Sequence, residues 1–184
     1  MPGSETIPRI YNHSYAITAS LEIPEGGAEG VIVAEADHLG GFSLYVQDGK
    51  LKHTYSMMGV LIYRKESDAE LPTGQQVEVR MEFAADAAAP ATGGDVTLFI
   101  NRERAGGGRM DHSVAFRFSG YSGMDIGRDA GLPVEHVCAD KSPFAFTGTI
   151  NKVLFDIDPH LTEEDRQAVH EHAHHGALAC GIGA

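Results

Sequence analysis

The chain has no tryptophan, only two cysteines, and far fewer basic than acidic residues. Cys138 and Cys180 form no Cys-x-x-Cys pair and are too few for a disulfide framework, so we expect free thiols. Fourteen basic against 26 acidic residues leave a formal net charge of -12. This charge would repel nucleic-acid phosphates and anionic lipid head groups. We therefore expect no nucleic-acid partner and no membrane partner.

Targeting signals are also missing from these 184 residues. The first five residues lack the basic start and apolar stretch of a signal peptide, and no apolar run approaches the length of a membrane span. Free thiols suit a reducing compartment, so we expect a soluble protein that is cytoplasmic by default. With 42% hydrophobic residues, the chain can bury one substantial core. The predicted domains are an extension over 1–11, a β domain over 12–158, and a helix with a frayed tail over 159–184.

Short strands separated by Gly-rich turns account for most of the chain. Apolar residues alternate with polar ones over 14–23, which is typical of a strand with one buried face. Residues 30–34 are apolar on both faces, as in a strand that lies between two others. Further strands are predicted at 76–83, 96–100, 114–118, 124–126 and 153–157. Ile150 is out of phase with the last of these, which predicts a bulge near 151–152.

Two hairpins are predicted from their turns. Asp48-Gly49 favours the positive φ angles of a type I′ turn, with Val46 opposite Leu51, Leu44 opposite His53, and Phe42 opposite Tyr55. His53 is the one polar member of that face, and we interpret it as a structural, hydrogen-bonded core or rim residue. The second turn, Asn101-Arg102, requires either a left-handed Arg102 or a wider loop that uses residues 106–108.

The pattern of elements predicts an all-β fold, a two-sheet antiparallel sandwich followed by a C-terminal α-helix. The helix is predicted because Thr162 is a suitable N-cap and is followed by acidic first-turn residues, while 166–179 contains few strand formers. Its apolar stripe is weak, so we expect loose docking on the sandwich or on a partner.

Several segments carry a resemblance to a known family. They are Asn-His-Ser-Tyr-Ala-Ile-Thr-Ala at 12–19, the segment at 23–31, Gly-Gly-Phe-Ser-Leu-Tyr-Val-Gln-Asp-Gly-Lys at 40–50, Asp-Ile-Gly-Arg-Asp at 125–129, and Pro-Phe-Ala-Phe-Thr-Gly-Thr-Ile at 143–150. In this order they resemble the C-terminal region of large bacterial arylsulfatases, over roughly residues 10–158. The resemblance implies a β-rich module that follows an α/β catalytic domain. The strand pattern is also similar to concanavalin A or laminin-G-like jelly rolls.

The family's chemistry does not carry over to this chain. Sulfatases use a formylglycine made from a Cys/Ser-x-Pro-x-Arg motif, and neither Cys138 nor Cys180 is followed by that Pro and Arg. The Glu-x-Asp-x-x-Glu arrangement of laminarinase-type sandwich glycosidases is also missing. We therefore expect no catalytic residue and no cofactor in this chain alone.

Two weak binding sites can be suggested from the sequence. His170 and His174 would lie one turn apart on the C-terminal helix and could hold zinc or nickel, although two ligands favour adventitious binding. Arg128 in Gly127-Arg128-Asp129 could bind an anion, or the neighbouring Arg and Asp could instead fix a loop.

The first functional hypothesis is a non-catalytic accessory domain that packs on a sulfatase catalytic domain, in the same longer protein or in trans, or that self-associates. The alternative is a free-standing lectin-like module that binds a glycan. Tyr45 and Tyr63 are then the candidate aromatics, although the lack of tryptophan weakens this hypothesis because sugar platforms favour large rings.

Overall fold

The computed structural model describes residues 8, 10–135 and 142–158, and within these ranges it contains ten β-strands and no helix. The described part therefore offers no helix that is long and apolar enough to cross a membrane. The strands are β1 (Tyr15–Ile23), β2 (Gly30–Asp37), β3 (Gly40–Gln47), β4 (Lys50–Met57), β5 (Leu61–Glu70), β6 (Gln75–Ala85), β7 (Gly94–Ile100), β8 (Glu103–Met110), β9 (Met124–Ile126) and β10 (Thr149–Ile157).

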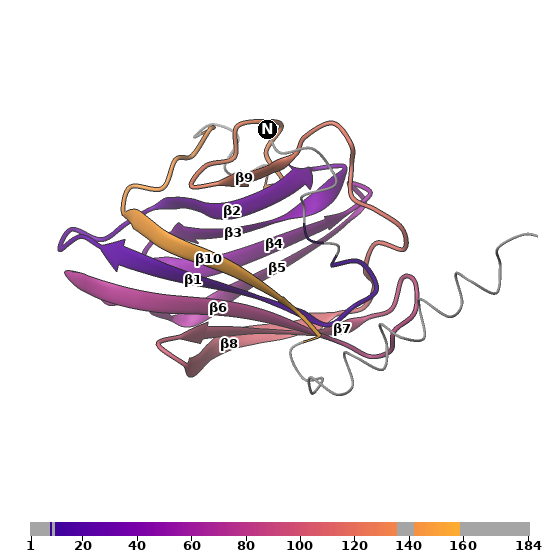
Figure 1. The fold of residues 1–184 in the computed structure, drawn as a ribbon, viewed down its shortest axis with the longest axis horizontal. Coiled ribbons are helices and arrows are strands. Elements are labelled where there is room, and N and C mark those ends of the chain that lie inside the picture. Colours follow the sequence, from indigo (N-terminus) through magenta and orange to yellow (C-terminus); the bar gives the residue numbers. More distant parts are fainter. Residues whose placement is uncertain (1–7, 9, 136–141, 159–184) are drawn as a thin grey trace, which may run out of the picture.

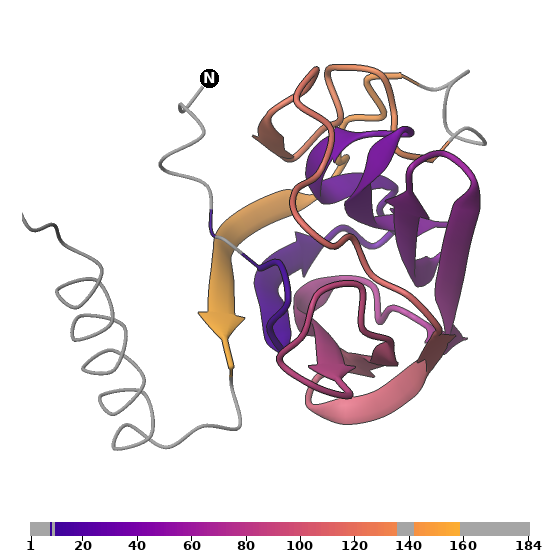
Figure 2. The same cartoon turned by 90° about the vertical axis from the view of Figure 1, so that its right-hand side faces the viewer.

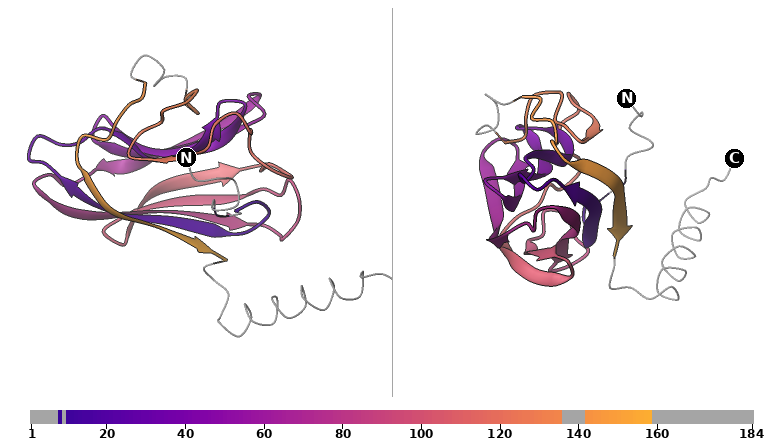
Figure 3. Two further views of the ribbon diagram at one scale, coloured as in Figure 1. Left: turned by 45° about the horizontal axis from the view of Figure 1, so that its top comes forward. Right: turned by 90° about the vertical axis from the view of Figure 1, so that its left-hand side faces the viewer.

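The strands form two curved layers that face each other (Figure 1). Their order is β10-β1-β6-β7-β8-β5-β4-β3-β2-β9, and neighbouring strands pair antiparallel throughout. The layers are joined where β5 meets β8, through the pair Ser67 and Gly106 (Figure 3). The predicted all-β antiparallel fold is thus confirmed, although the ten strands form one continuous sheet that curls into two layers rather than two separate sheets. The predicted C-terminal helix lies outside the described residues.

Alternation along the strands produces the core between the layers. In β6, for example, Val79 and Met81 are fully buried while Glu78 and Arg80 on the other face are partly exposed. Burial of apolar surface of this kind is the main stabilising contribution to such a fold. The largest fully buried side chains come from both layers: Ile17, Leu21, Met81 and Leu98 from one, and Ile32, Phe42, Leu44 and Leu51 from the other.

Most of the predicted local geometry is confirmed. The β3–β4 ladder has the predicted register, and the turn residues Asp48 and Gly49 have φ angles of 55° and 73°. Arg102 adopts the left-handed conformation, with φ 70°, so the second hairpin keeps a tight turn. The ladder between β1 and β10 shifts between Lys152 and Ile150, which is the predicted bulge.

The strand predicted at 114–118 is wrong. This segment instead crosses one end of the sandwich as irregular chain, where Phe118 is buried and Phe116 is 84% exposed. The strand that pairs with β7 is β8, which contains the three successive glycines 106–108 that a wider loop would have used. Gly107 has φ 140°, and a Cβ there would lie 2.1 Å from the Val96 carbonyl oxygen, so only glycine fits this ladder.

Candidate functional site

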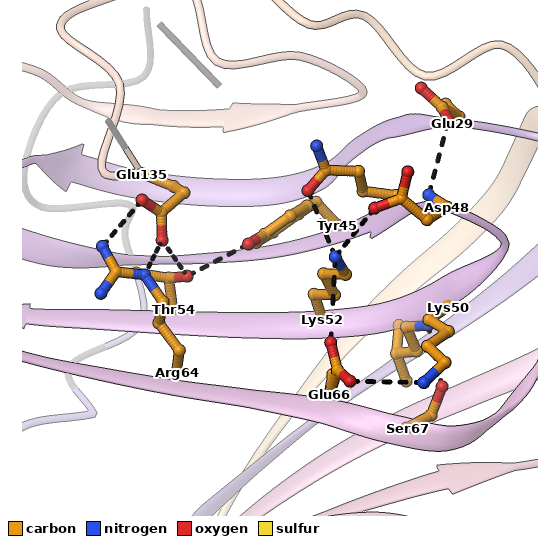
Figure 4. A network of polar contacts seen from close by, with 12 residues as sticks. Glu29, Tyr45, Asp48, Lys50, Lys52, Thr54, Arg64, Glu66, Ser67 and Glu135 are labelled. Carbon is orange, nitrogen blue, oxygen red and sulfur yellow. Dashed lines mark hydrogen bonds and ion pairs between the residues drawn. The ribbon is translucent and has the colours of Figure 1, made fainter. Parts of the chain in front are cut away.

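The outer face of β3, β4 and β5 carries polar side chains, in contrast to the apolar face that these strands turn toward the core. Cross-strand pairing sets Tyr45 opposite Lys52, and Lys52 opposite Glu66. The next pair of β4 and β5 residues on this face is Thr54 with Arg64. A hollow of about 280 Å³ lies on this face, and we call it the β3–β5 hollow. Figure 4 shows the network of polar contacts among the side chains of this face. It is lined by Tyr45, Gln47, Lys52, Arg64, Lys65, Glu66 and Glu135.

One end of the hollow is organised by Glu135, which comes from the segment that follows β9. Its carboxylate accepts hydrogen bonds from Arg64 Nε at 2.6 Å, from Arg64 Nη2 at 3.0 Å, and from Thr54 Oγ1 at 2.9 Å. Glu135 is buried, whereas the Arg64 side chain is 50% exposed. The bidentate contact raises the pKa of Arg64, because it stabilises the charged guanidinium. Glu135 therefore holds a guanidinium in one orientation at the rim of the hollow.

Tyr45 forms part of the floor of the hollow. Its ring packs edge-on against Phe144, with the ring centroids 6.4 Å apart, and its hydroxyl lies 3.3 Å from Thr54 Oγ1. Only 4% of the residue is exposed. Tyr45 therefore borders the hollow, but it does not present an open aromatic face of the kind on which a sugar ring stacks.

The other end of the hollow is organised by Lys52. Its Nζ lies 3.1 Å from Asp48 Oδ2, 3.4 Å from Gln47 Oε1 and 3.9 Å from Glu66 Oε2. Glu66 also pairs with Lys50, at 3.3 Å. Cations and carboxylates therefore alternate across the hollow. Such a surface offers hydrogen-bond donors and acceptors side by side without a large excess of either charge.

The other residues predicted to bind ligands lie elsewhere. Tyr63 is on the opposite face of β5, where its hydroxyl accepts a hydrogen bond from the His112 backbone N–H at 3.2 Å. Arg128 is exposed beyond β9, outside the lining of the β3–β5 hollow. Its neighbour Asp129 is buried, which raises the pKa of that carboxyl, and Asp129 Oδ2 accepts the Val134 N–H at 3.1 Å.

The two metal candidates, His170 and His174, lie outside the described residues. Within residues 8, 10–135 and 142–158, no group of three or more His, Cys, Asp or Glu side chains could hold a metal ion. His53 is in the core as predicted. The prediction that His53 is hydrogen-bonded is wrong, however, since neither nitrogen of its ring has a hydrogen-bond partner among the described residues.

Sequence reasoning missed most of the hollow. Arg64 and Glu66 lie in β5, which was not predicted, and Glu135 lies 71 residues from Arg64 in the chain. The register of the first hairpin could have placed Lys52 beside Tyr45 on the outer face, but no local signal brings Glu135 to them. A buried carboxylate that meets a distant arginine is a tertiary contact, visible only once the sheet is assembled.

These features define an all-β antiparallel sandwich with a polar hollow on one sheet. No protein-family model and no curated protein matches the chain. Among solved structures, domains LG4-5 of the mouse laminin α1 chain are similar, with a TM-score of 0.58 and 12% identity. That match covers 85% of this chain and 39% of the laminin chain, so this chain spans well under half of its length.

The CBM40 domain of the Ruminococcus gnavus IT-sialidase is also similar. One structure of it gives a TM-score of 0.57 and 17% identity, covering 91% of this chain and 87% of that one. A second, bound to α2,3-sialyllactose, gives 0.53 and 16%, covering 85% and 82%. At identities this low, the structural similarity shows a shared jelly-roll fold and nothing about function. These three neighbours are not sulfatases.

Proposed function

We propose that this domain is a non-catalytic, lectin-like carbohydrate-binding module whose glycan site is the β3–β5 hollow. The observation that carries the proposal is the fixed guanidinium of Arg64. Two of its nitrogens are held by the buried Glu135, while half of the side chain remains exposed. Its Nη1 makes no hydrogen bond within the described part of the chain. A donor that is already oriented loses little conformational entropy when it binds a ligand.

The chemistry of the hollow suits a ligand rich in hydroxyl groups. Each sugar hydroxyl can donate one hydrogen bond and accept others, so it is best met by donors and acceptors in alternation. Lys52 and Arg64 supply donors, while Glu66 and Gln47 supply acceptors. The similarity to a domain solved with α2,3-sialyllactose supports sugars as the first ligands to test.

A glycan array followed by calorimetry tests this proposal. We would titrate the protein with the array hits, and with lactose and α2,3-sialyllactose as a neutral and an acidic probe. Arg64→Lys keeps the charge but loses the forked geometry, and it should weaken binding by about tenfold or more, since hydrogen bonds to charged groups contribute about 1.5–3 kcal/mol. Arg102→Lys is the matched control, because Arg102 is 87% exposed on the distant β7–β8 turn.

Two results would contradict the proposal. One is the failure of every glycan on the array to bind the folded protein. The other is a loss of affinity that is the same for Arg64→Lys and Arg102→Lys, since binding would then depend on general charge rather than on the hollow.

The sulfatase-accessory hypothesis is a second proposal, which rests on the resemblance of the sequence. Segments that carry the resemblance meet in space although they are far apart in the chain. Val31 N–H donates to the Phe144 carbonyl at 2.9 Å, and Phe146 N–H donates to the Gly127 carbonyl at 2.9 Å. A purified arylsulfatase catalytic domain should then bind this chain in a pull-down and gain thermal stability. If it does neither, this second proposal fails and the glycan proposal is untouched.

A further inference from the structure

The last strand, β10, is paired along one edge only. It pairs with β1 from Ile157 to Thr149, and no other described residue pairs with its outer edge, which forms the margin of the sheet (Figure 2). Its core-facing residues Val153 and Phe155 are only partly buried, and Leu154 on the other face is 47% exposed. A nine-residue strand with an open edge is a template for pairing with another strand.

The backbone groups on that edge can be assigned from one hydrogen bond. Asp158 N–H donates to the Ser14 carbonyl at 2.6 Å, so Asp158 belongs to a hydrogen-bonded pair of the antiparallel ladder. Such pairs recur at every second residue, so Asp156 and Leu154 also direct their backbone groups toward β1. Val153 and Phe155 therefore direct their N–H and C=O groups outward.

We propose that β10 pairs antiparallel with β10 of a second copy of this chain, about a twofold axis at Leu154. Val153 then faces the partner's Phe155, and both residues are of the outward-bonding kind that such a pair requires. Lys152 faces the partner's Asp156, and the symmetry repeats this opposite-charge pair. The sheet thereby continues across both molecules and covers the half-exposed apolar side chains of β10.

The charge pattern selects this register among its neighbours. An axis at Phe155 would set Leu154 opposite the partner's Asp156, and an axis at Val153 would set Lys152 opposite the partner's Leu154. Each of these leaves a charge against an apolar side chain, whereas directly opposite charges stabilise cross-strand pairs. An axis at Phe155 would also set Lys152 opposite the partner's Asp158, but Asp158 lies beyond the end of β10 and its carboxylate contacts His13 Nδ1 at 2.8 Å. The axis at Leu154 is therefore the self-complementary one within the strand. The proposed pairing assigns the self-association expected from the sequence to the outer edge of β10.

Sedimentation velocity of the full chain over a concentration series tests the proposal. The wild type should sediment as a reversible dimer. Lys152→Asp would place carboxylates opposite each other at both symmetry-related positions and should raise the dimer dissociation constant by about tenfold or more. The double variant Lys152→Asp with Asp156→Lys reverses both charges and should restore the dimer. Arg102→Asp carries the same charge change far from β10 and should leave the dimer intact.

Hydrogen exchange provides a second measurement that needs no variant. The amides of Val153 and Phe155 should become more protected as the wild-type concentration rises, while that of Leu154, which is bonded to β1, should not change. The proposal is overturned if the wild type is a monomer at every concentration, or if Lys152→Asp does not weaken the dimer. It is also overturned if the folded double variant stays monomeric, or if the protection of the Val153 and Phe155 amides does not change with protein concentration.

Discussion

Two buried side chains should make the stability of this protein respond to pH in opposite directions. The first is His53 on β4, which is 1% exposed and stacks on Phe42 with ring centroids 6.4 Å apart. Burial, with a smaller contribution from Lys65, lowers its pKa from 6.5 to about 3. The unfolded chain binds a proton at His53 below pH 6.5 and the folded chain does not. Stability that is present above this pH is therefore lost as the pH falls.

The second is Glu35 on β2, which is 4% exposed. Burial raises its pKa from 4.5 to about 7, against the opposing effect of the hydrogen bond that Tyr11 donates at 3.2 Å. The folded chain holds a proton on Glu35 in a range where the unfolded chain has released it. Stability that is present below pH 4.5 is therefore lost as the pH rises toward 7.

The two effects nearly cancel in the wild type. Between about pH 5 and about pH 6.5, each group changes the free energy of unfolding by roughly 2 kcal/mol, with opposite signs. His53→Leu leaves Glu35 alone, so stability should rise by about 2 kcal/mol, relative to wild type, as the pH is lowered across this range. Glu35→Gln leaves His53 alone, and stability should fall by about the same amount.

Urea unfolding followed by far-UV circular dichroism measures these slopes, because the chain has no tryptophan for fluorescence. All other carboxylates are common to the three proteins, so the comparison between them isolates each group. His112→Leu is the matched control, since it makes the same substitution at an exposed histidine. Parallel stability curves for wild type, His53→Leu and Glu35→Gln would refute this reasoning.

Three further outcomes are expected. Gly41→Ala should lower the free energy of unfolding by several kcal/mol, roughly in the range of an overpacked core, because the added Cβ would lie 2.2 Å from the Glu35 carbonyl oxygen. In the control Gly26→Ala, the added Cβ meets nothing within 4 Å, and the thermal midpoint should stay nearly unchanged. The purified chain should hydrolyse no aryl sulfate above a heat-killed control, and turnover with contaminants excluded would show that it holds its own nucleophile. Zinc should bind at about micromolar affinity or weaker, and His170→Ala with His174→Ala should abolish it in calorimetry; nanomolar binding would point to a complete metal site.

The parts of the fold that local chemistry determines could be predicted. The turn at Asp48-Gly49 fixes two positive φ angles, and the hairpin register follows from it with no long-range information. The alternation in β6 likewise needs only the rule that one face is buried. The bulge in β10 was visible because one apolar residue, Ile150, fell out of phase.

The missed parts depend on contacts between distant segments. β5 contains five charged residues among ten, and its polar outer face is stabilised by partners on β4 and by Glu135 rather than by an apolar pattern. β8 is a strand because its glycines let it approach β7 closely. In the sequence alone, successive glycines indicate a turn or loop, so β8 was not predicted. The hollow could not be predicted for the same kind of reason, since it lies partly on β5 and is completed by Glu135 from the segment beyond β9.

The pairing of β1 with β10 also constrains how the protein can be made in the cell. Tyr15 on β1 is paired with both Phe83 and Ile157, so one side of β1 stays open until the ribosome has released nearly all of the described chain. Until then a nascent chain exposes an unpaired edge, which is a hazard for aggregation. Folding of the complete sheet must therefore wait until Ile157 has been synthesised, and pairing across such a long stretch of sequence is intrinsically slow. A chaperone that binds the nascent chain until β10 has been synthesised would raise the yield of folded protein.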